Sequence, residues 1–419
     1  MPTLPDDVTA ALTAPLARVD ADLAARFPGE PGVRQPVHTC YVPADQMRAT
    51  LADDWGAAAL ATLDTHAGEP PMLAAVTGIP SELAERVHAH VRRVLATAPI
   101  ADLRVDCEDG YGDHDDAEED AHAVAAADAL RAAADAGRLP ASYGLRPKSL
   151  DPAVRTRGLR SLDLFVTTLA AGGAVPPGLV VTLPKVNTPA QVEVFCDILT
   201  ELENRLDIGS GLGAGIRLEV QVETPAAVLA LPAIVAAGRP RLTGLHVGTY
   251  DYSAALGVSA EHQASDHPAV ELATALMQLV AAGTGVQVAD GSSNLLPVGD
   301  RAAVHAAWRR HADLVRRAWM RGIYQGWDLH PAQLVSRHAT VAACLLTGLP
   351  AALARLSAWT RTPGSGMAGS GTVADEPATA RALAGHIQRA LDAGLLDDAD
   401  LPVGLTRERP IPADGPVIC

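Results

Sequence analysis

Eight short runs of β-branched and apolar residues recur along the chain, separated by longer stretches rich in Ala, Leu and Arg. The alternation predicts repeated βα units around a parallel sheet. Eight such units favour a closed TIM barrel over an open doubly wound sheet, because no Gly-x-Gly-x-x-Gly turn follows the first run. The runs span residues 37–42, 101–109, 143–148, 179–186, 216–224, 242–251, 285–291 and 322–331.

The segments outside the regular βα pattern predict three parts. We expect an N-terminal helical segment at 1–35, the barrel at 36–350 with a helical insertion at about 43–99, and a linker with a helical tail at 351–419. In the tail, Pro377 suits a first helical turn, with Asp375 close to the N-cap. The acidic cluster at 113–120 predicts the solvated N-terminal turn of another helix.

Composition excludes several partners. The net charge of -16 argues against nucleic acid and anionic membrane surfaces, which bind basic faces. Five scattered cysteines without a Cys-x-x-Cys pair suggest neither a disulfide framework nor a zinc site. We see no basic leader and no continuous apolar run of about 18 residues, so we expect a cytoplasmic protein without a membrane span.

Lysine is scarce in this chain. Among 33 lysines and arginines, only Lys148 and Lys185 are lysines, and each follows a proline at the end of an apolar run. An ammonium differs from a guanidinium fork in geometry and in how easily it loses its proton. Two interpretations stay open: point charges that orient carboxylates, or a Schiff-base nucleophile.

Charged side chains follow most of the predicted strands. In a TIM barrel such residues gather at one rim, where the reactive groups lie. Two carboxylates on neighbouring strands, Glu223 and Asp251, suit Mg²⁺, with Mn²⁺ as a second option, while Arg146 suits a substrate oxygen. Helix capping or a buried ion pair would explain the same residues. The full set is Glu108, Asp109, Arg146, Lys148, Lys185, Glu223, Asp251, Asp328 and His330.

The order of short motifs resembles one superfamily, that of the citrate lyase β-subunit, malyl-CoA lyase and HpcH/HpaI aldolases, which also includes malate synthases. The motifs are DCEDGYG, GLRPKS, LPKV, VETPAAV, GTYDYSAALG, LHPAQ and ADEP, between about 37 and 391. The resemblance implies a TIM barrel with a Mg²⁺ site that makes or cleaves a carbon–carbon bond through a metal-stabilised enolate. This chain departs from the common pattern at Asn187 and in its Tyr250-Asp251-Tyr252 segment.

The resemblance also implies roles for single residues. Glu223 and Asp251 match the metal ligands, Arg146 the arginine on the substrate oxygen, and Glu108 and Asp109 the acidic pair near the metal. Asp375 resembles the acid/base residue that reaches a neighbouring subunit's site, which implies a trimer or hexamer. The remaining expected substrate contacts are Lys148, Lys185 and His330.

These expectations describe a carbon–carbon lyase or aldolase of the citrate lyase β type. Its substrate would be a small hydroxy acid or 2-oxo acid, with an acyl-CoA thioester as an open alternative. Two other functions compete: a phosphotransferase that uses phosphoenolpyruvate or pyruvate, and a non-catalytic barrel that binds a 2-oxo acid. The chain lacks the Gly-x-x-x-x-Gly-Lys phosphate loop, which disfavours the phosphotransferase.

Overall fold

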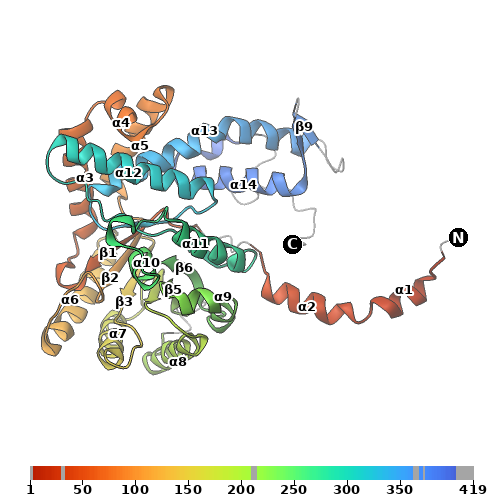
Figure 1. The fold of residues 1–419 in the computed structure, drawn as a ribbon, viewed down its shortest axis with the longest axis horizontal. Coiled ribbons are helices and arrows are strands. Elements are labelled where there is room, and N and C mark those ends of the chain that lie inside the picture. The colour runs from red at the N-terminus through yellow and green to blue at the C-terminus, as the bar shows by residue number, and fades with distance from the viewer. Residues whose placement is uncertain (1–2, 30–33, 209–214, 362–367, 371–372, 403–419) are drawn as a thin grey trace.

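The eight β-rich runs form eight parallel strands of one sheet, in the order β7-β6-β5-β4-β3-β2-β1-β8. A parallel bridge between Ala289, which ends β7, and Gln325, just before β8, brings the two edges together. The predicted TIM barrel is therefore confirmed (Figure 1). The strands are β1 Thr39–Pro43, β2 Asp102–Asp106, β3 Ser142–Arg146, β4 Leu179–Leu183, β5 Arg217–Val222, β6 Leu242–Val247, β7 Gln287–Ala289 and β8 Trp327–Asp328.

The structure is a computed structural model that describes residues 3–29, 34–208, 215–361, 368–370 and 373–402. Most of the barrel wall is covered by helices that follow β2 to β6; α6 to α9 each pack on the next, and α11 packs on both α9 and α10. Prolines begin several of them, as expected where a backbone N–H needs no partner. These helices are α6 Asp116–Asp135, α7 Arg155–Ala170, α8 Pro189–Leu206, α9 Pro225–Ala237, α10 Thr249–Ala255 and α11 Pro268–Ala281.

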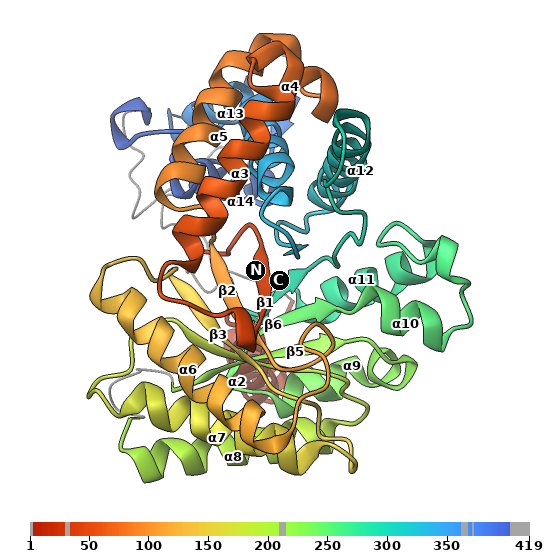
Figure 2. The same cartoon turned by 90° about the vertical axis from the view of Figure 1, so that its left-hand side faces the viewer.

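The helices that follow β1, β7 and β8 gather into one cluster beside the barrel (Figure 2). The segment 43–99 contributes three of its helices, and the C-terminal helix packs along the same cluster. One of the six, α13, crosses position 350 without a break, so the predicted start of the tail falls inside a helix. The cluster consists of α3 Leu51–Ala67, α4 Pro70–Thr77, α5 Ala84–Thr97, α12 Arg301–Met320, α13 Gln333–Arg361 and α14 Pro377–Asp392.

Helix α13 also bears on the question of a membrane span. Its window Gln333–Trp359 has a mean hydropathy of 1.6 and is long enough to cross a bilayer. Polar residues interrupt this window, so it is not one continuous apolar run. However, 56% of that window is buried against the rest of the protein. Its apolar residues therefore have partners inside the fold, as in the core helix of a globular protein.

The remaining elements lie at the two ends of the chain or in loops. The acidic cluster does begin a helix: Asp115 accepts hydrogen bonds from the N–H groups of Ala117 and Glu118, so the predicted N-terminal turn of α6 is confirmed. The other elements are α1 Asp6–Thr13, α2 Leu16–Arg26, the hairpin β9 Ala368–Ser370 and β10 Val373–Asp375, and the 3₁₀ turns η1 Ala44–Gln46, η2 Ser81–Leu83, η3 Ala260–His262 and η4 Asp398–Asp400.

The barrel interior is polar. Arg104 of β2 is fully buried, and its Nη2 lies 2.8 Å from both Asp102 Oδ2 and Glu219 Oε2 of β5. Gly144 of β3 makes room for it, because a Cβ there would lie 2.7 Å from Arg104 Nη1 and 1.6 Å from the Val180 carbonyl oxygen. Buried charges persist only when paired. The Arg104–Glu219 ion pair therefore ties β2 to β5, two of the strands that carry acidic residues to the barrel mouth.

Candidate active site at the barrel mouth

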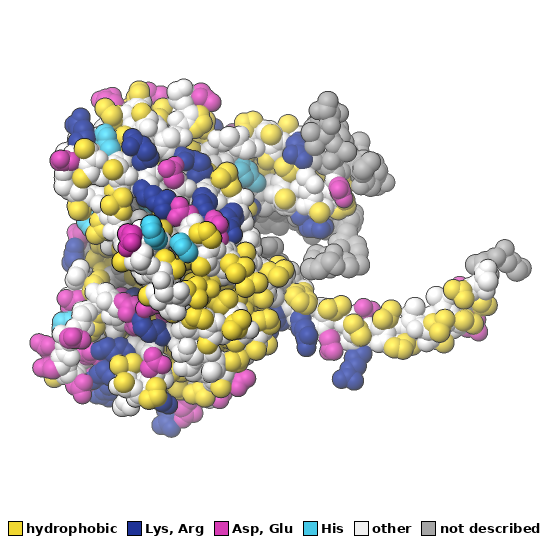
Figure 3. Space-filling model, in the orientation of Figure 1, with side chains coloured by type: hydrophobic (Ala, Val, Ile, Leu, Met, Phe, Trp, Pro, Cys, Tyr) yellow, Lys and Arg dark blue, Asp and Glu magenta, His cyan; other side chains and the backbone are white. Residues whose placement is uncertain are grey.

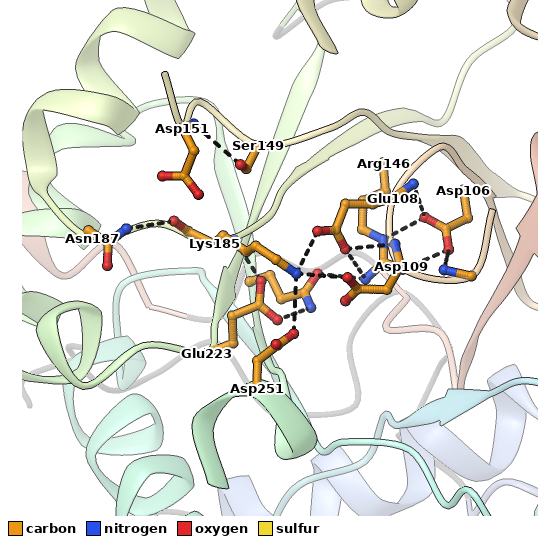
Figure 4. A network of polar contacts seen from close by, with 12 residues as sticks. Asp106, Glu108, Asp109, Arg146, Ser149, Asp151, Lys185, Asn187, Glu223 and Asp251 are labelled. Atoms are coloured by element: carbon orange, nitrogen blue, oxygen red, sulfur yellow. Dashed lines mark hydrogen bonds and ion pairs between the residues drawn. The ribbon is translucent and has the colours of Figure 1, made fainter. Parts of the chain in front are cut away.

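Six of the predicted site residues lie together where the strands end (Figure 4). They come from consecutive neighbours in the sheet, β2 to β6, because parallel strands deliver their carboxyl ends to the same rim. Alternation along each strand then turns the last inward-facing side chains toward the barrel axis. The six are Glu108, Asp109, Arg146, Lys185, Glu223 and Asp251.

Three carboxylates form a possible metal site. Asp109, Glu223 and Asp251 each offer one oxygen, and these oxygens lie within 4.8 Å of one another. The sequence predicted Glu223 and Asp251 as ligands and gave Asp109 a catalytic place. The geometry adds Asp109 to the pair. An all-oxygen set of this kind suits Mg²⁺ or Mn²⁺.

Lys185 holds these acids together. Its Nζ lies 2.6 Å from Glu108 Oε1, 2.8 Å from Asp109 Oδ1 and 3.3 Å from Asp251 Oδ2. Burial lowers the pKa of Lys185, but hydrogen bonds to Asp109 and Glu108 outweigh burial and hold the pKa above its usual value. The side chain is therefore an ammonium that offsets repulsion among the carboxylates.

The backbone at Lys185 is also shaped by the site. Its φ is +50°, in the left-handed region that side chains other than glycine seldom adopt. In this conformation the Lys185 N–H donates to Glu223 Oε1 over 2.6 Å. A strained residue at a strand end is a recognised mark of a functional site.

Glu223 is buried, with 1% of its surface exposed, yet the hydrogen bonds that it accepts from the described residues come only from neutral donors, the Lys185 N–H and the Gln221 amide. Burial raises the pKa of the Glu223 carboxyl to about 8, although Arg146 and Lys185 lower it. Gly248 permits its position, because a Cβ there would lie 2.3 Å from Glu223 Oε2. A buried carboxylate short of positive charge fits a divalent cation.

Arg146 is fixed before any substrate binds. Its Nε and Nη2 donate to the two oxygens of Asp106, both over 2.7 Å, and its Nη1 donates to Gln221 Oε1 over 3.0 Å. The guanidinium lies 4.7 Å from the centre of the Tyr41 ring. The bidentate pair with Asp106 and the contact with the Tyr41 ring hold the guanidinium of Arg146 in a single orientation.

Sequence reasoning missed Asp106 and Gln221, which orient Arg146 and Glu223. A signal was available for both. Each stands two residues before a predicted site residue, Glu108 or Glu223, and strand side chains two apart share a face.

Lys148 and His330 lie outside this cluster, and their expected substrate contacts stay a prediction. The Lys148 ammonium pairs with Glu119 of α6 instead. His330 accepts a hydrogen bond from the Ala332 N–H, just before α13 begins. This contact is the helix-capping role that the sequence offered as the alternative to substrate binding. Asp328 is fully buried and contacts Arg337 and His38, so it faces the helical cluster.

Asp375 ends β10, and its side chain lies outside the described residues. The β9–β10 hairpin is at the far end of α13 from the barrel (Figure 1). Within one chain, the hairpin that ends with Asp375 therefore lies away from the barrel.

Two cavities lie at the opposite end of the barrel. Their volumes are about 440 and 270 Å³, and residues at the N-terminal ends of the strands line both, such as Ala101 and Ser142. We place the candidate chemistry at the mouth because the carboxylates, Arg146 and Lys185 converge there, in keeping with the rule for TIM barrels.

We expect Mg²⁺ binding to release a proton near pH 7. The folded pKa of Glu223, about 8, is above its ordinary value of 4.5, so the metal-free protein holds a proton that a cation must displace. The raised pKa also means that this group destabilises the metal-free fold progressively between about pH 4.5 and 8. Calorimetry in buffers of different ionisation enthalpy measures the released proton.

The control for proton release is Glu223→Gln, which carries no titratable proton. Mg²⁺ binding should then be much weaker and should release none. Equal proton release by both proteins would contradict this account of Glu223.

A family model described as "Domain of unknown function (DUF6986)" matches residues 16–410. No curated protein matches the chain significantly. A citrate lyase from Burkholderia xenovorans LB400 is similar in structure, with a TM-score of 0.57 and 20% identity over 88% of this chain and 95% of that one.

Two further structures are similar. CitE from Mycobacterium tuberculosis, solved with magnesium, acetoacetate and coenzyme A, has a TM-score of 0.51 and 18% identity over 87% of this chain and 100% of that one. Haloferax volcanii malate synthase has a TM-score of 0.50 and 16% identity over 73% and 72%. At these identities the likeness shows the fold, in agreement with the barrel that the motifs implied.

Proposed function

The chain belongs to the DUF6986 family, whose function is unknown, and from the geometry of its mouth we propose that it is a Mg²⁺-dependent carbon–carbon lyase. Its substrate is a small hydroxy acid or the CoA thioester of one. The observation that carries the proposal is the trio Asp109, Glu223 and Asp251, whose oxygens lie within 4.8 Å of one another beside a fixed arginine.

The charge balance of the mouth supports a cation. Within the described part of the chain, five carboxylates meet there with two basic side chains, Arg146 and Lys185. The acids are Asp106, Glu108, Asp109, Glu223 and Asp251. Asp106 is paired with Arg146, whereas the donors to buried Glu223 among the described residues are both neutral. When bound, Mg²⁺ supplies a Lewis acid that stabilises negative charge on a carbonyl oxygen.

The proposed cleavage step assigns separate roles to a base and to Arg146. In the cleavage direction a base takes the hydroxyl proton, that carbon becomes a carbonyl, and the electrons of the broken carbon–carbon bond move onto the carbonyl oxygen of the other fragment. Arg146 is held in place to donate a hydrogen bond to that oxygen, and a donor with a preorganised orientation is effective because it need not reorient during the reaction. A proton delivered to the carbon then completes the second product.

Glu108 is the proposed base within the same subunit. Its side chain is 7% exposed and lies 2.6 Å from Lys185 Nζ and 3.6 Å from Arg146 Nη1. Burial raises its pKa, although Arg146 lowers it, and a raised carboxyl pKa suits proton exchange near neutral pH. Asp375 of a neighbouring subunit remains our proposed second acid/base residue, because its hairpin lies far from the mouth of its own chain.

Lys185 acts as a point charge in this proposal, because its pKa is raised rather than lowered. We expect no covalent adduct when the protein is treated with borohydride and pyruvate and analysed by mass spectrometry. A Schiff base needs a neutral amine. An adduct on Lys185 or Lys148 would overturn the metal mechanism and restore the alternative that the sequence left open.

A substrate screen tests the function. The full chain with Mg²⁺ is incubated with 4-hydroxy-2-oxo acids and with 3-hydroxyacyl-CoA thioesters, and release of glyoxylate, pyruvate or acetyl-CoA is measured. Mg²⁺-dependent release that EDTA abolishes supports a lyase. Tight binding of a 2-oxo acid with Mg²⁺ but without cleavage would instead support the non-catalytic barrel. We place the activity in the cytoplasm, in a homo-oligomer.

A further inference from the structure

Two apolar surfaces of the protein are left uncovered by the residues that the structure describes, and the first is its N-terminal arm. The arm, residues 3–29, carries α1 and α2 away from the body (Figure 1), and neither helix has a buried residue. Its large apolar residues recur every three or four positions, which places them on one helix face. They are Leu4, Val8, Leu12, Leu16, Val19, Leu23 and Phe27, each at least 39% exposed.

The second surface is the outer face of two neighbouring barrel helices, α9 and α11. Helix α9 contains no polar or charged residue at all. The exposed positions of both helices are all apolar, and we call them the α9–α11 face (Figure 3). They are Ala226, Leu229, Pro232, Ala233 and Ala236 on α9, and Pro268, Leu272, Ala275 and Leu279 on α11.

Other helices on the barrel wall behave differently. The exposed positions of α7, for example, are Arg155, Thr156, Arg160, Asp163 and Thr167, as expected for a solvated face. On the α9–α11 face, Leu229 is 86% exposed and Leu279 is 71% exposed. A contiguous apolar surface of this kind marks an interaction site.

The arm is anchored beside this face but directed outward. Arg239, just after α9, donates a hydrogen bond to the carbonyl oxygen of Ala25 over 2.7 Å, and it also bonds that of Arg26. The Gly29 N–H donates to the Gly283 carbonyl oxygen, just after α11, over 2.9 Å. The arm therefore leaves the body between the ends of α9 and α11. It does not cover the α9–α11 face of its own chain.

We propose that the arm of one copy covers the α9–α11 face of a second copy of this chain. The two helices of the arm reach on the order of 30 Å at 1.5 Å per residue, longer than either α9 or α11. Because the anchored end of the arm is adjacent to the α9–α11 face of the same copy, a two-fold axis between two copies lets both exchange their arms at once. Such an exchange offers two arm-on-face contacts, and a stable dimer needs roughly 800 Å² per partner.

Charge favours a protein partner over a membrane. The charged residues of α1 and α2 are four aspartates and two arginines, whereas helices that lie on membranes are rich in Lys and Arg on their polar face. The whole chain has a net charge of -16. Among the described residues, the α9–α11 face matches the arm in chemistry and position, and it belongs to this chain itself.

Three full-length variants and the unmodified chain test the proposal by sedimentation velocity over a concentration series. Leu12→Asp/Val19→Asp alters the arm, and Leu229→Asp/Leu279→Asp alters the face. Met72→Asp, on α4 in the helical cluster, is the control, because Met72 is 40% exposed on neither surface. We expect both double variants to weaken self-association at least about 100-fold, and the control to leave it unchanged.

A cross-link separates exchange between copies from folding back within one. Copies with Val19→Cys and one tag are mixed with copies with Leu272→Cys and another tag, treated with a short bismaleimide, and mapped by mass spectrometry. Linkage of positions 19 and 272 between the two tags supports the proposal. It also decides the matter if an aspartate variant fails to fold.

Four results would overturn the inference: a monomer at every concentration, dissociation by the arm variant but not the face variant, cross-links only within one chain, or binding to phosphatidylglycerol vesicles without self-association. None of these results depends on the lyase assay. The inference can therefore fail while the proposed function stands, and the reverse is also true.

Discussion

Replacing Glu223 by Gln is expected to lower the Mg²⁺-dependent kcat by about three orders of magnitude, because a bound metal supplies several kcal/mol of charge stabilisation in the transition state. The amide keeps the size of the side chain but cannot carry a negative charge to a cation. Since burial raises the pKa of Glu223 to about 8, the carboxyl is already neutral at pH 7 without metal. The metal-free fold should therefore keep its Tm.

The measurement is steady-state turnover with Mg²⁺ titrated, beside thermal unfolding without metal. Asp251→Asn should behave similarly, because Asp251 belongs to the same oxygen cluster. The matched control is Glu193→Gln, the same chemical change on the exposed face of α8, which should leave turnover and Mg²⁺ dependence intact. Full activity in both Glu223→Gln and Asp251→Asn would show that the metal assignment is wrong.

Replacing Arg146 by Gln should affect activity and stability together. Loss of a preorganised donor to a developing oxyanion typically costs about 100- to 1,000-fold in kcat. The change also leaves Asp106 buried without its bidentate partner, and breaking a buried ion pair costs about 3–5 kcal/mol. Hydrogen bonds from the N–H groups of Glu108 and Gly110 to Asp106 offset part of that loss.

A double variant separates the two effects of Arg146. Arg146→Gln/Asp106→Asn replaces the ion pair by two neutral amides, which should restore much of the free energy of unfolding while kcat stays low. Urea unfolding and turnover are measured on the same preparations. Recovery of activity along with stability would mean that Arg146 only supports the fold and does not contact the substrate.

The fold was predictable because its signal is local and repeated. Eight runs with strand composition, each followed by a helical stretch, leave few arrangements other than a barrel. Strand ends were less predictable. The run at 322–331 yields only Trp327–Asp328, and the run at 285–291 only Gln287–Ala289, because hydrogen bonding to neighbouring strands sets strand length.

The site was predictable to the extent that barrel topology converts sequence order into spatial proximity. Residues at the ends of β2 to β6 had to share a rim, whatever their side chains did there. Lys148 shows the limit of that reasoning. It lies two positions after Arg146, the last residue of β3, yet its ammonium pairs with Glu119 of α6. Which cation pairs with which acid depends on side-chain directions that no motif encodes.

The sequence by itself determined the barrel, the order of its strands and the presence of acids and cations at one rim, because periodicity and turn residues act over a few neighbouring positions. Only the tertiary structure decided that Lys185 bridges three carboxylates and that Asp106 and Gln221 orient Arg146 and Glu223. It also decided that an apolar arm, directed away from the body, is anchored next to an exposed apolar face. These features join residues far apart in the chain, and burial, charge pairing and packing arise only when the strands have closed.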